Sequence, residues 1–360
     1  MKHIGLNILL LWLCLPINMQ ANNKEGKFKK EKTLHRTYQV HKIGEVHIDN
    51  EYGNINISTW QKNTVDITAN ISVDGNDAED VNKRIQNIQI HLSQTGNSIH
   101  AKTTIESTHR SWNLISWISK NSSNVNFKIN YDIKMPVQHD LFIDNDYGNI
   151  YIDELNGRLN LNADYGKFEI GNLYNNNNKI ETDYFSNSSI DLIKGGRITA
   201  DYSNIHIGQA DALQMSCDYT KIIIDKIKKL KYNNDYGSIK VLNGTEIIGS
   251  GDYQSRYFAY VDYLKINSDY GSINIQNLLP NFSNIDITCD YVKIKINNQK
   301  QVAYRFKIDQ EYGCFKQNNL EILRDIRNGG DKLFEGYYLH KDTKSFIRIV
   351  EDYGCIKIIN

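Results

Sequence analysis

The chain has 360 residues with 42 basic and 42 acidic side chains, so its formal net charge is zero. This balance argues against a nucleic-acid partner, because nucleic acids bind basic surfaces, and against a charged tail that tethers the chain to a partner. The chain is long enough to bury a large core and contains only three prolines.

Residues 1–21 are typical of a secretory signal peptide. A short polar start precedes a mostly apolar run from Ile4 to Ile17 and a cleavage site at Met19-Gln20-Ala21. The apolar run is too short for a comfortable membrane span, and no later segment is apolar enough to cross a membrane. Leu13 is larger than the residue that usually precedes a lipidated cysteine, so a lipid anchor at Cys14 is disfavoured. We expect export across the inner membrane of a Gram-negative cell, to the periplasm or the outer surface.

Residues 22–35 are polar, and we expect them to form a disordered lead. Residues 36–140 are expected to form an N-terminal β-rich region with one short amphipathic helix near residues 77–87. Within this region Tyr52 fits the frame of the later repeats. Residues 106–124 are expected to be a loop that carries Trp112 and Trp117. These tryptophans form either a contact patch for a partner or an apolar plug over the first repeat.

An Asp-Tyr-Gly motif organises residues 141–315. Full copies alternate with copies that keep only the acidic residue and the tyrosine, and successive tyrosines lie 18, 19, 18, 17, 17, 17, 17, 21 and 21 residues apart. A nearly constant period is the signature of a solenoid in which each repeat is one rung. The expected fold is therefore all-β, a single-domain-like parallel β-solenoid (β-helix) with about 17–21 residues per rung.

Apolar and polar residues alternate within each rung. Positions six and four before the tyrosine are apolar, as at Leu159 and Leu161, and so are positions three and five after it, as at Phe168 and Ile170. This alternation predicts two strands with one buried face each, and the change of parity requires a corner, which we place at the glycine after the tyrosine. In this interpretation the tyrosines point inward and stack as a structural ladder of Tyr147, Tyr165, Tyr184, Tyr202, Tyr219, Tyr236, Tyr253, Tyr270, Tyr291 and Tyr312.

The acidic residue before each tyrosine is expected to point outward. Carboxylates stacked at strand spacing repel each other by on the order of 1 kcal/mol per pair in water. Hydrogen bonds to corner amides, splayed rotamers or a bound cation would offset this repulsion. The Gly-rich nonapeptide of calcium β-rolls is absent, so a structural acid column is favoured over a calcium site.

The period breaks after Tyr312, and the next tyrosine in frame, Tyr353, follows 41 residues later. We expect residues 316–360 to form a capping hairpin and a last rung, because a bare terminal rung exposes an unpaired edge. Cys314 and Cys355 each lie two residues after a tyrosine and pair only if their rungs are neighbours, which the sequence leaves open.

Residues that break the repeat pattern are the candidates for a site. Arg197, His206, Arg256 and Lys293 each stand alone in a rung, whereas parallel β-helix enzymes that act on polysaccharides gather such residues on one face. We therefore expect no catalytic residues and interpret these four as solvated side chains. No phosphate loop, nucleophile elbow or Cys/His metal spacing occurs, so neither a metal nor a cofactor is indicated.

Aromatic residues provide the candidates for ligand binding. Arg256, Tyr257 and Tyr260 lie in the least regular rung, which is either a sugar-binding patch or, as we favour, a bulge. The other two candidates are Trp112 and Trp117.

The chain resembles the DUF4097 β-strand-repeat family, which is related to the adhesin head domains of auto-transporter type in bacterial envelopes. The resemblance rests on the opening Gly44–Ile57, on Thr59-Trp60 with the Val65–Ile67 strand, on Tyr131–Pro136 and on the Asp-Tyr-Gly rungs, and it covers roughly residues 36–360. It implies a β-solenoid of the cell envelope with an adhesin-like role and supplies no catalytic residues. This chain differs in its strong tyrosine column and in its longer rungs after Tyr270.

These patterns favour a non-catalytic, secreted or envelope β-solenoid that acts as an adhesin-like binding or scaffold module. Its partner would be an envelope protein or a glycan, which the sequence does not identify. The alternatives are a polysaccharide-acting β-helix enzyme and a periplasmic sensor or assembly partner.

Overall fold

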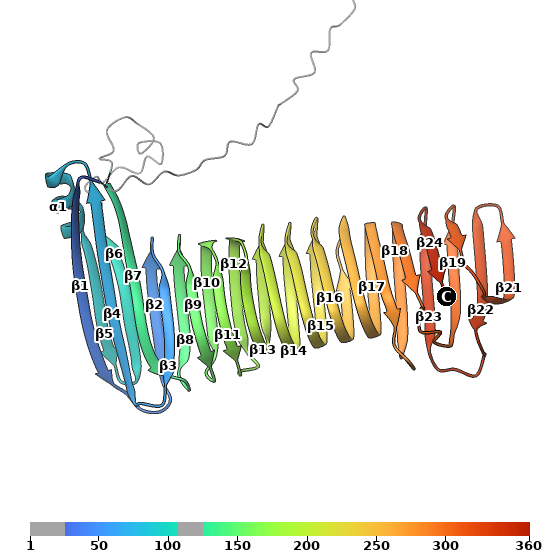
Figure 1. Cartoon of the computed structure of the whole chain (residues 1–360), viewed down its shortest axis with the longest axis horizontal. Helices are drawn as coiled ribbons and strands as arrows, with labels where there is room; N and C mark the ends of the chain where they lie inside the picture. Colours follow the sequence, from blue (N-terminus) through green and yellow to red (C-terminus); the bar gives the residue numbers. More distant parts are fainter. Residues whose placement is uncertain (1–25, 107–124) are drawn as a thin grey trace, which may run out of the picture.

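The structure, a computed structural model, describes residues 26–106 and 125–360. The expected signal peptide and the loop with Trp112 and Trp117 lie outside the described residues. Within them the chain forms 24 β-strands in one hydrogen-bonded sheet and one α-helix. Figure 1 shows a rod of stacked strands with α1 at one end. The expectation of an all-β, solenoid-like single domain is confirmed.

Each rung consists of two strands that meet at the tyrosine. The first three rungs of the regular repeat are β8 (Asp140–Asp146) with β9 (Ile150–Leu155), β10 (Leu159–Gly166) with β11 (Phe168–Leu173), and β12 (Asn178–Phe185) with the start of β13 (Ser188–Asp201). The strands before the tyrosines pair in parallel with one another, as β8 does with β10, and those after the tyrosines pair separately, as β9 does with β11. We call these two layers the pre-corner sheet and the post-corner sheet.

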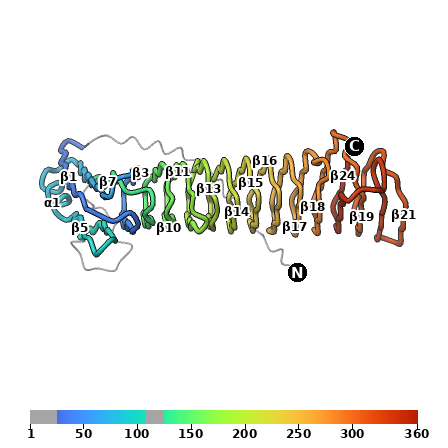
Figure 2. The backbone as a smooth tube through the Cα atoms, turned by 90° about the horizontal axis from the view of Figure 1, so that it is seen from below, coloured from blue at the N-terminus to red at the C-terminus, as the bar shows by residue number. Residues whose placement is uncertain are grey.

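From β13 to β17 a single strand runs through the turn opposite the tyrosine and contributes to both sheets. These strands are β13, β14 (Asn204–Asp218), β15 (Lys221–Asp235), β16 (Ser238–Ser250) and β17 (Gln254–Leu278). β18 (Asn284–Asn297) begins after that turn and passes through the corner at Tyr291. Neighbouring rungs keep one register, which pairs Ile190 with Ile207 and Ala200 with Cys217. Figure 2 shows the result as successive coils of one tube.

The core lies between the two sheets, as the alternation predicts. Leu159, Leu161 and Phe168 are fully buried, and Ile170 is 2% exposed. The same positions in the other rungs are mostly isoleucine, which packs well on a pleated surface.

The predicted inward orientation of the tyrosines is wrong. Every tyrosine of the ladder is exposed, by 41% at Tyr270 and 62% at Tyr312, for example. The reason is the backbone: these tyrosines have φ angles between 48° and 61°, in the left-handed region. This conformation forms the corner at the tyrosine itself and turns its ring outward, so the next residue, such as Thr220 or Gln254, is the buried one.

The glycine after the tyrosine has a different role from the one predicted. At Gly148 and Gly166 the backbone φ is not positive, so the corner does not depend on them, whereas Gly271 is an exception with a φ of 132°. A Cβ atom at Gly148 would instead clash with the carbonyl oxygen of Gly53 in the neighbouring rung. The glycine therefore allows the backbones of stacked rungs to approach each other at the corner.

The N-terminal end begins with a rung formed by β2 (Glu45–Glu51), Tyr52 and β3 (Ile55–Trp60). Two further layers extend it. One layer is an antiparallel group of three strands, β1 (Phe28–Gln39), β4 (Thr64–Gly75) and β7 (Val125–Pro136). The other is the antiparallel pair of β5 (Ile88–Thr95) and β6 (Ser98–Ile105). The helix α1 (Ala78–Asn87) packs mainly on β4 and β1.

Since β1 starts at Phe28, the disordered lead predicted for residues 22–35 is wrong for residues 28–35. Among the described residues, no helix has the length and apolar character that a membrane span requires.

The C-terminal end departs from chain order. Its strands are β19 (Tyr304–Glu311), β20 (Cys314–Lys316), β21 (Glu321–Asn328), β22 (Asp331–Tyr338), β23 (Phe346–Asp352) and β24 (Cys355–Ile359). β23 pairs in parallel with β18 on one side and with β19 on the other, so the last rung of the sequence lies between two earlier ones. β22 pairs with β19 and β21 with β22, both antiparallel, which leaves β21 outermost at this end (Figure 1).

This insertion settles the pairing of the cysteines. Cys314 of β20 lies opposite Cys355 of β24, and the two form a disulfide bond. Cys217 and Cys289 are free thiols buried in the core.

Candidate binding surface

One column of side chains runs along the outer face of the pre-corner sheet, five residues before each tyrosine. We call it the outer track. In spatial order it contains His47, Phe142, Asn160, Lys179, Arg197, Gln214, Lys231, Ile248, Lys265, Asp286, Arg348 and Lys307, and His100 of β6, which pairs with His47, extends it at the N-terminal end. Because each strand contributes one residue at the same register, the column is linear and follows the axis of the rod.

An aromatic groove of about 400 Å³ lies at the N-terminal end of the track. The ring of His47 stacks between His100, at a centroid distance of 4.6 Å, and Phe142, at 4.3 Å. Glu45 accepts a hydrogen bond from the His47 ring at 3.0 Å, and Asp49 pairs with Lys102 beside it. The groove thus combines an aromatic stack with charged groups, as pockets that orient a polar ligand do.

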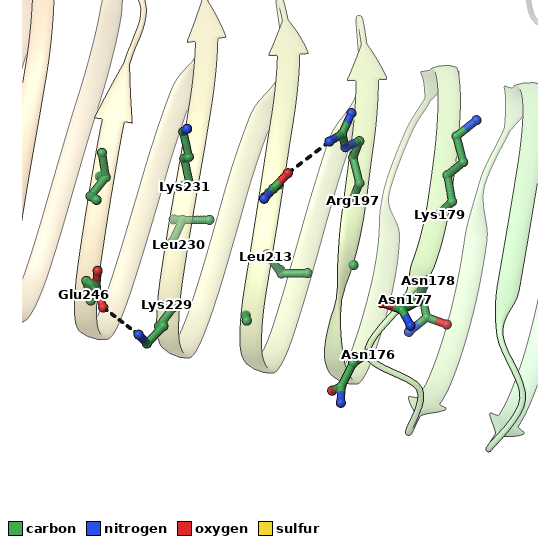
Figure 3. A pocket seen from close by; sticks show the side chains of 14 residues that line it. Asn176, Asn177, Asn178, Lys179, Arg197, Leu213, Lys229, Leu230, Lys231 and Glu246 are labelled. Atoms are coloured by element: carbon green, nitrogen blue, oxygen red, sulfur yellow. Dashed lines mark hydrogen bonds and ion pairs between the residues drawn. The ribbon is translucent and has the colours of Figure 1, made fainter.

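A larger basic groove of about 730 Å³ lies farther along the track, over β12 to β16 (Figure 3). Its floor includes Leu213 and Leu230, and its polar lining includes Lys179, Arg197 and Lys231. The sequence explains its position: Asn176 and Asn177 lie in the turn before β12, whereas the following rungs pass this turn as continuous strands.

The charge of the basic groove is only partly compensated. Lys229 pairs with Glu246 at 3.2 Å, Lys179 pairs with Glu181 at 2.7 Å outside the groove, and Arg197 donates a hydrogen bond to the neutral Gln214 at 3.1 Å. Among the ion pairs of the described residues, none involves Arg197 or Lys231. The groove therefore presents positive charge to any ligand, and arginine and lysine both bind carboxylates and sulfates well.

The tyrosine ladder is a second feature of the surface. It has twelve members, because Tyr52 extends it at the N-terminal end and Tyr353 lies between Tyr291 and Tyr312. Neighbouring rings lie nearly parallel with centroids between 4.7 and 5.3 Å apart, which is the spacing of the rungs. Their faces are covered by one another, so only ring edges and hydroxyl groups remain for contact with a ligand.

The acid column beside the ladder is held by main-chain hydrogen bonds. Asp235 accepts a hydrogen bond from the backbone N–H of Asp252 at 2.7 Å, and Asp252 accepts one from Asp269 at 2.8 Å. Burial raises the pKa of Asp146 and Asp290, and neighbouring carboxylates of the column raise it further. Among the described residues, no group of three or more His, Cys, Asp and Glu side chains is arranged to hold a metal ion.

The sequence candidates do not converge on one site. Arg197 lies in the basic groove, His206 lies in a different groove on the post-corner sheet, where it pairs with Asp225 at 3.0 Å, and Lys293 is exposed on β18. Arg256, interpreted as a solvated side chain, is 1% exposed, so that interpretation is wrong.

Tyr257 and Tyr260 are half-buried and each lies beneath a lysine. Lys240 lies 5.6 Å from the ring centroid of Tyr257, and Lys300 lies 4.8 Å from that of Tyr260. Cation–π contacts of this kind are common on exposed surfaces and occupy the ring faces. Whether either tyrosine binds a ligand stays a prediction, as it does for Trp112 and Trp117, which lie outside the described residues.

Sequence reasoning missed the outer track. The positions between the apolar residues were classified only as polar, although their identity was readable at a fixed offset from each tyrosine. Reading that offset rung by rung gives His47, Phe142, Lys179, Arg197 and Lys231 in order, and this was the available signal.

Comparisons with known proteins add little to this description. No family model matches the chain and no curated protein matches it, so the DUF4097 resemblance is not confirmed. Similar solved structures include a putative adhesin from Parabacteroides distasonis, with 9% identity and a TM-score of 0.33 over 91% of this chain and 97% of that one. A putative adhesin from Parabacteroides merdae has 12% identity and a TM-score of 0.32 over 75% of this chain and 94% of that one.

A putative cell adhesion protein from Clostridium sporogenes is also similar, with 11% identity and a TM-score of 0.19 over 91% of this chain and 99% of that one. Scores and identities this low support neither a family assignment nor a function for this chain.

Proposed function

We propose that the chain is a non-catalytic, adhesin-like binding module of the cell envelope or cell surface that holds an extended acidic polysaccharide along the outer track. The observation that carries this proposal is the linear column of one side chain per rung, with the aromatic groove and the basic groove aligned on it. A rigid row of this kind fits a linear polymer better than a compact ligand.

The chemistry of the track favours a sugar polymer with negative charge. Rungs repeat at about 4.8 Å, so an extended glycan meets a new side chain at intervals close to the size of one sugar ring. In the middle of the track Lys179, Arg197 and Lys231 provide donors for carboxylates or sulfates. At its N-terminal end the ring edges of Phe142 and His47 provide apolar surface for a sugar, because the faces of these rings are covered by each other, by His100 and by Arg158.

The enzyme alternative gains no support from the geometry. It requires Arg256 and His206 on one face, but Arg256 is buried in the core and His206 is exposed beside Asp225. The sensor alternative depends on the loop with Trp112 and Trp117 and remains open. The solved structures described as putative adhesins agree with the proposal without supporting it.

A glycan array that pairs acidic polysaccharides with neutral ones of the same backbone tests the proposal. We expect the mature protein to retain the acidic members and to lose them when Lys179, Arg197 and Lys231 are all replaced by alanine, a variant we call the track triple. The matched control replaces Lys221, Lys226 and Lys293, which are exposed on the other sheet, and changes the net charge equally. Equal loss in both variants, or preference for neutral glycans, would contradict the proposal.

A further inference from the structure

One rung of the solenoid buries a positive charge. Three residues after the tyrosine most rungs carry an apolar side chain, such as Ile239 or Ile273, and the rung of Tyr184 carries the small polar Asn187, but the rung of Tyr253 carries Arg256. Its side chain is 1% exposed and is the largest of the fully buried ones.

The same rung makes room for this side chain. In most rungs the residue four before the tyrosine is large and apolar, and the residue two before it is small. In the rung of Tyr253 both positions are glycine, Gly249 and Gly251. A Cβ atom at Gly249 would clash with the ring of Tyr232 from the preceding rung, so that ring fills part of the space. The guanidinium of Arg256 crosses the core and donates a hydrogen bond from Nη2 to the carbonyl oxygen of Gly251.

Several buried polar atoms around Arg256 have no partner among the described residues. They belong to three consecutive rungs and are Asn234 Oδ1, Gln254 Nε2 and Oε1, Arg256 Nε and Nη1, and Ser268 Oγ. These four side chains are at most 3% exposed, and the buried Tyr232 hydroxyl lies beside the guanidinium of Arg256. Most of the atoms can donate a hydrogen bond and only two are carbonyl oxygens, so the interior is rich in donors at this point.

The charge of Arg256 also lacks a counter-charge. Arginine stays protonated in proteins, and an isolated buried ion destabilises the folded state. No ion pair of the described residues includes Arg256. The nearby Asp235 and Asp252 bind backbone N–H groups of the acid column instead. Burial raises the pKa of Tyr232 more than its contact with Arg256 lowers it, so its phenol is neutral near pH 7 and supplies no negative charge.

We infer that the core between the rungs of Tyr236, Tyr253 and Tyr270 binds one small monovalent anion of halide size. Arg256 Nε and Nη1, Gln254 Nε2 and the hydroxyl groups of Ser268 and Tyr232 are its donors. An anion supplies both the missing counter-charge and an acceptor for several converging donors, whereas a water molecule supplies only the acceptor. Because the site lies inside the tube, the ion is structural rather than part of the outer track.

Crystals grown with bromide as the only halide test the location of the ion. We expect one anomalous peak per chain within hydrogen-bonding distance of Arg256 Nε or Nη1. Electron density without anomalous signal at that position, which ordered water would give, overturns the inference. This experiment uses the unaltered protein and so does not depend on whether a variant folds.

A second experiment measures the ion in solution. The protein is dialysed exhaustively against sodium gluconate and then unfolded, and released chloride is counted by ion chromatography. Its melting temperature is also followed as chloride replaces gluconate at constant ionic strength. We expect either one released chloride per chain or a melting temperature that rises with chloride. In the Arg256→Met variant both the released chloride and the rise in melting temperature should be absent. Arg36→Met, the same change at an exposed position outside the grooves, keeps both. The absence of both responses in the unaltered protein overturns the inference.

Discussion

Two exposed columns run along the rod, the tyrosine ladder and the outer track, and they differ in how much their composition varies. The ladder repeats one residue type twelve times, whereas the track carries histidine, phenylalanine, asparagine, lysine, arginine, glutamine, isoleucine and aspartate. A ladder residue must adopt a left-handed conformation and also stack on two neighbours. Neither constraint applies to a track residue, which lies on an open strand face. Repetition in this solenoid therefore marks a structural constraint, and variation marks the surface that is free to acquire specificity.

The energetics of the ladder agree with this distinction. A left-handed conformation costs a residue with a side chain roughly 1–2 kcal/mol. Each aromatic pair contributes about 0.5–1.5 kcal/mol, and an inner tyrosine takes part in two pairs. The two effects are of similar size, so a lone tyrosine at a corner is unfavourable and a continuous stack of them is tolerated.

The largest effect on stability is expected at the C-terminal end, where Tyr353 joins the ladder out of chain order. Replacing Cys314 and Cys355 by serine removes the bond that joins these two rungs and should lower the free energy of unfolding by about 2–4 kcal/mol. Urea denaturation measures this loss. The control Cys289→Ser leaves the disulfide intact but introduces a hydroxyl into the core. If the double variant matches the unaltered protein, strand pairing with β18 and β19 and the ladder hold the inserted rung without the disulfide.

Substitutions of one inner tyrosine separate stacking from backbone strain. Tyr219 stacks on Tyr202 at 4.8 Å and on Tyr236 at 5.0 Å, with a φ of 51°. Tyr219→Ala loses both contacts and keeps the strain, so we expect a loss of about 1–3 kcal/mol in urea unfolding. Tyr219→Gly loses the same contacts but relieves the strain and should be about 1 kcal/mol more stable than the alanine variant. A glycine variant no more stable than the alanine variant would contradict a strained corner.

A smaller, pH-dependent effect is expected from Glu351. Burial raises the pKa of this carboxyl group, and Gln310 opposes that by donating a hydrogen bond to it at 2.6 Å. Because the folded-state pKa is raised, the folded protein binds more protons, and stability should fall as pH rises from the ordinary glutamate value through the raised one. Melting temperatures between about pH 4 and 7 should show this decrease, and Glu351→Gln should reduce it, with Asp146 and Asp290 supplying the remainder. The exposed control Asp309→Asn should keep the decrease, and a slope unchanged by Glu351→Gln would contradict this origin.

The smallest effect on stability is expected from the track triple. Lys179, Arg197 and Lys231 are exposed, and single exposed charges contribute little to the folded state. The free energy of unfolding of the track triple, obtained from its melting curve, should therefore change by no more than about 0.5 kcal/mol per substitution. A large loss of stability would show that the track is part of the scaffold and would remove the contrast with the ladder.

Much of the scaffold was predictable, because a strand of period two assigns its side chains to two faces. The inward positions at Leu159, Leu161, Phe168 and Ile170 followed from alternation alone. The orientation of the tyrosine did not, because a corner before or after it leaves every other inward position unchanged. The deciding quantity is the φ angle of the tyrosine, which a pattern of apolar residues does not report.

The order of rungs at the C-terminal end was also beyond the pattern. The segment around Tyr353 fits the repeat frame equally well after Tyr312 or between Tyr291 and Tyr312. Only pairing with β18 and β19, together with the disulfide, distinguishes the two arrangements. Likewise, Arg256 looked like a surface residue because its burial depends on the glycines that precede it in the same rung.

The central claim is that the outer track binds a linear acidic polymer along several rungs, and a series of acidic oligosaccharides of increasing length tests it most directly. The basic groove spans the rungs from Lys179 to Ile248, so each added sugar should reach further side chains. Calorimetric titration should give an affinity that increases with oligosaccharide length until the groove is filled, and that decreases as salt is added. An affinity that is already maximal for a single sugar, or that does not respond to length, would contradict the account.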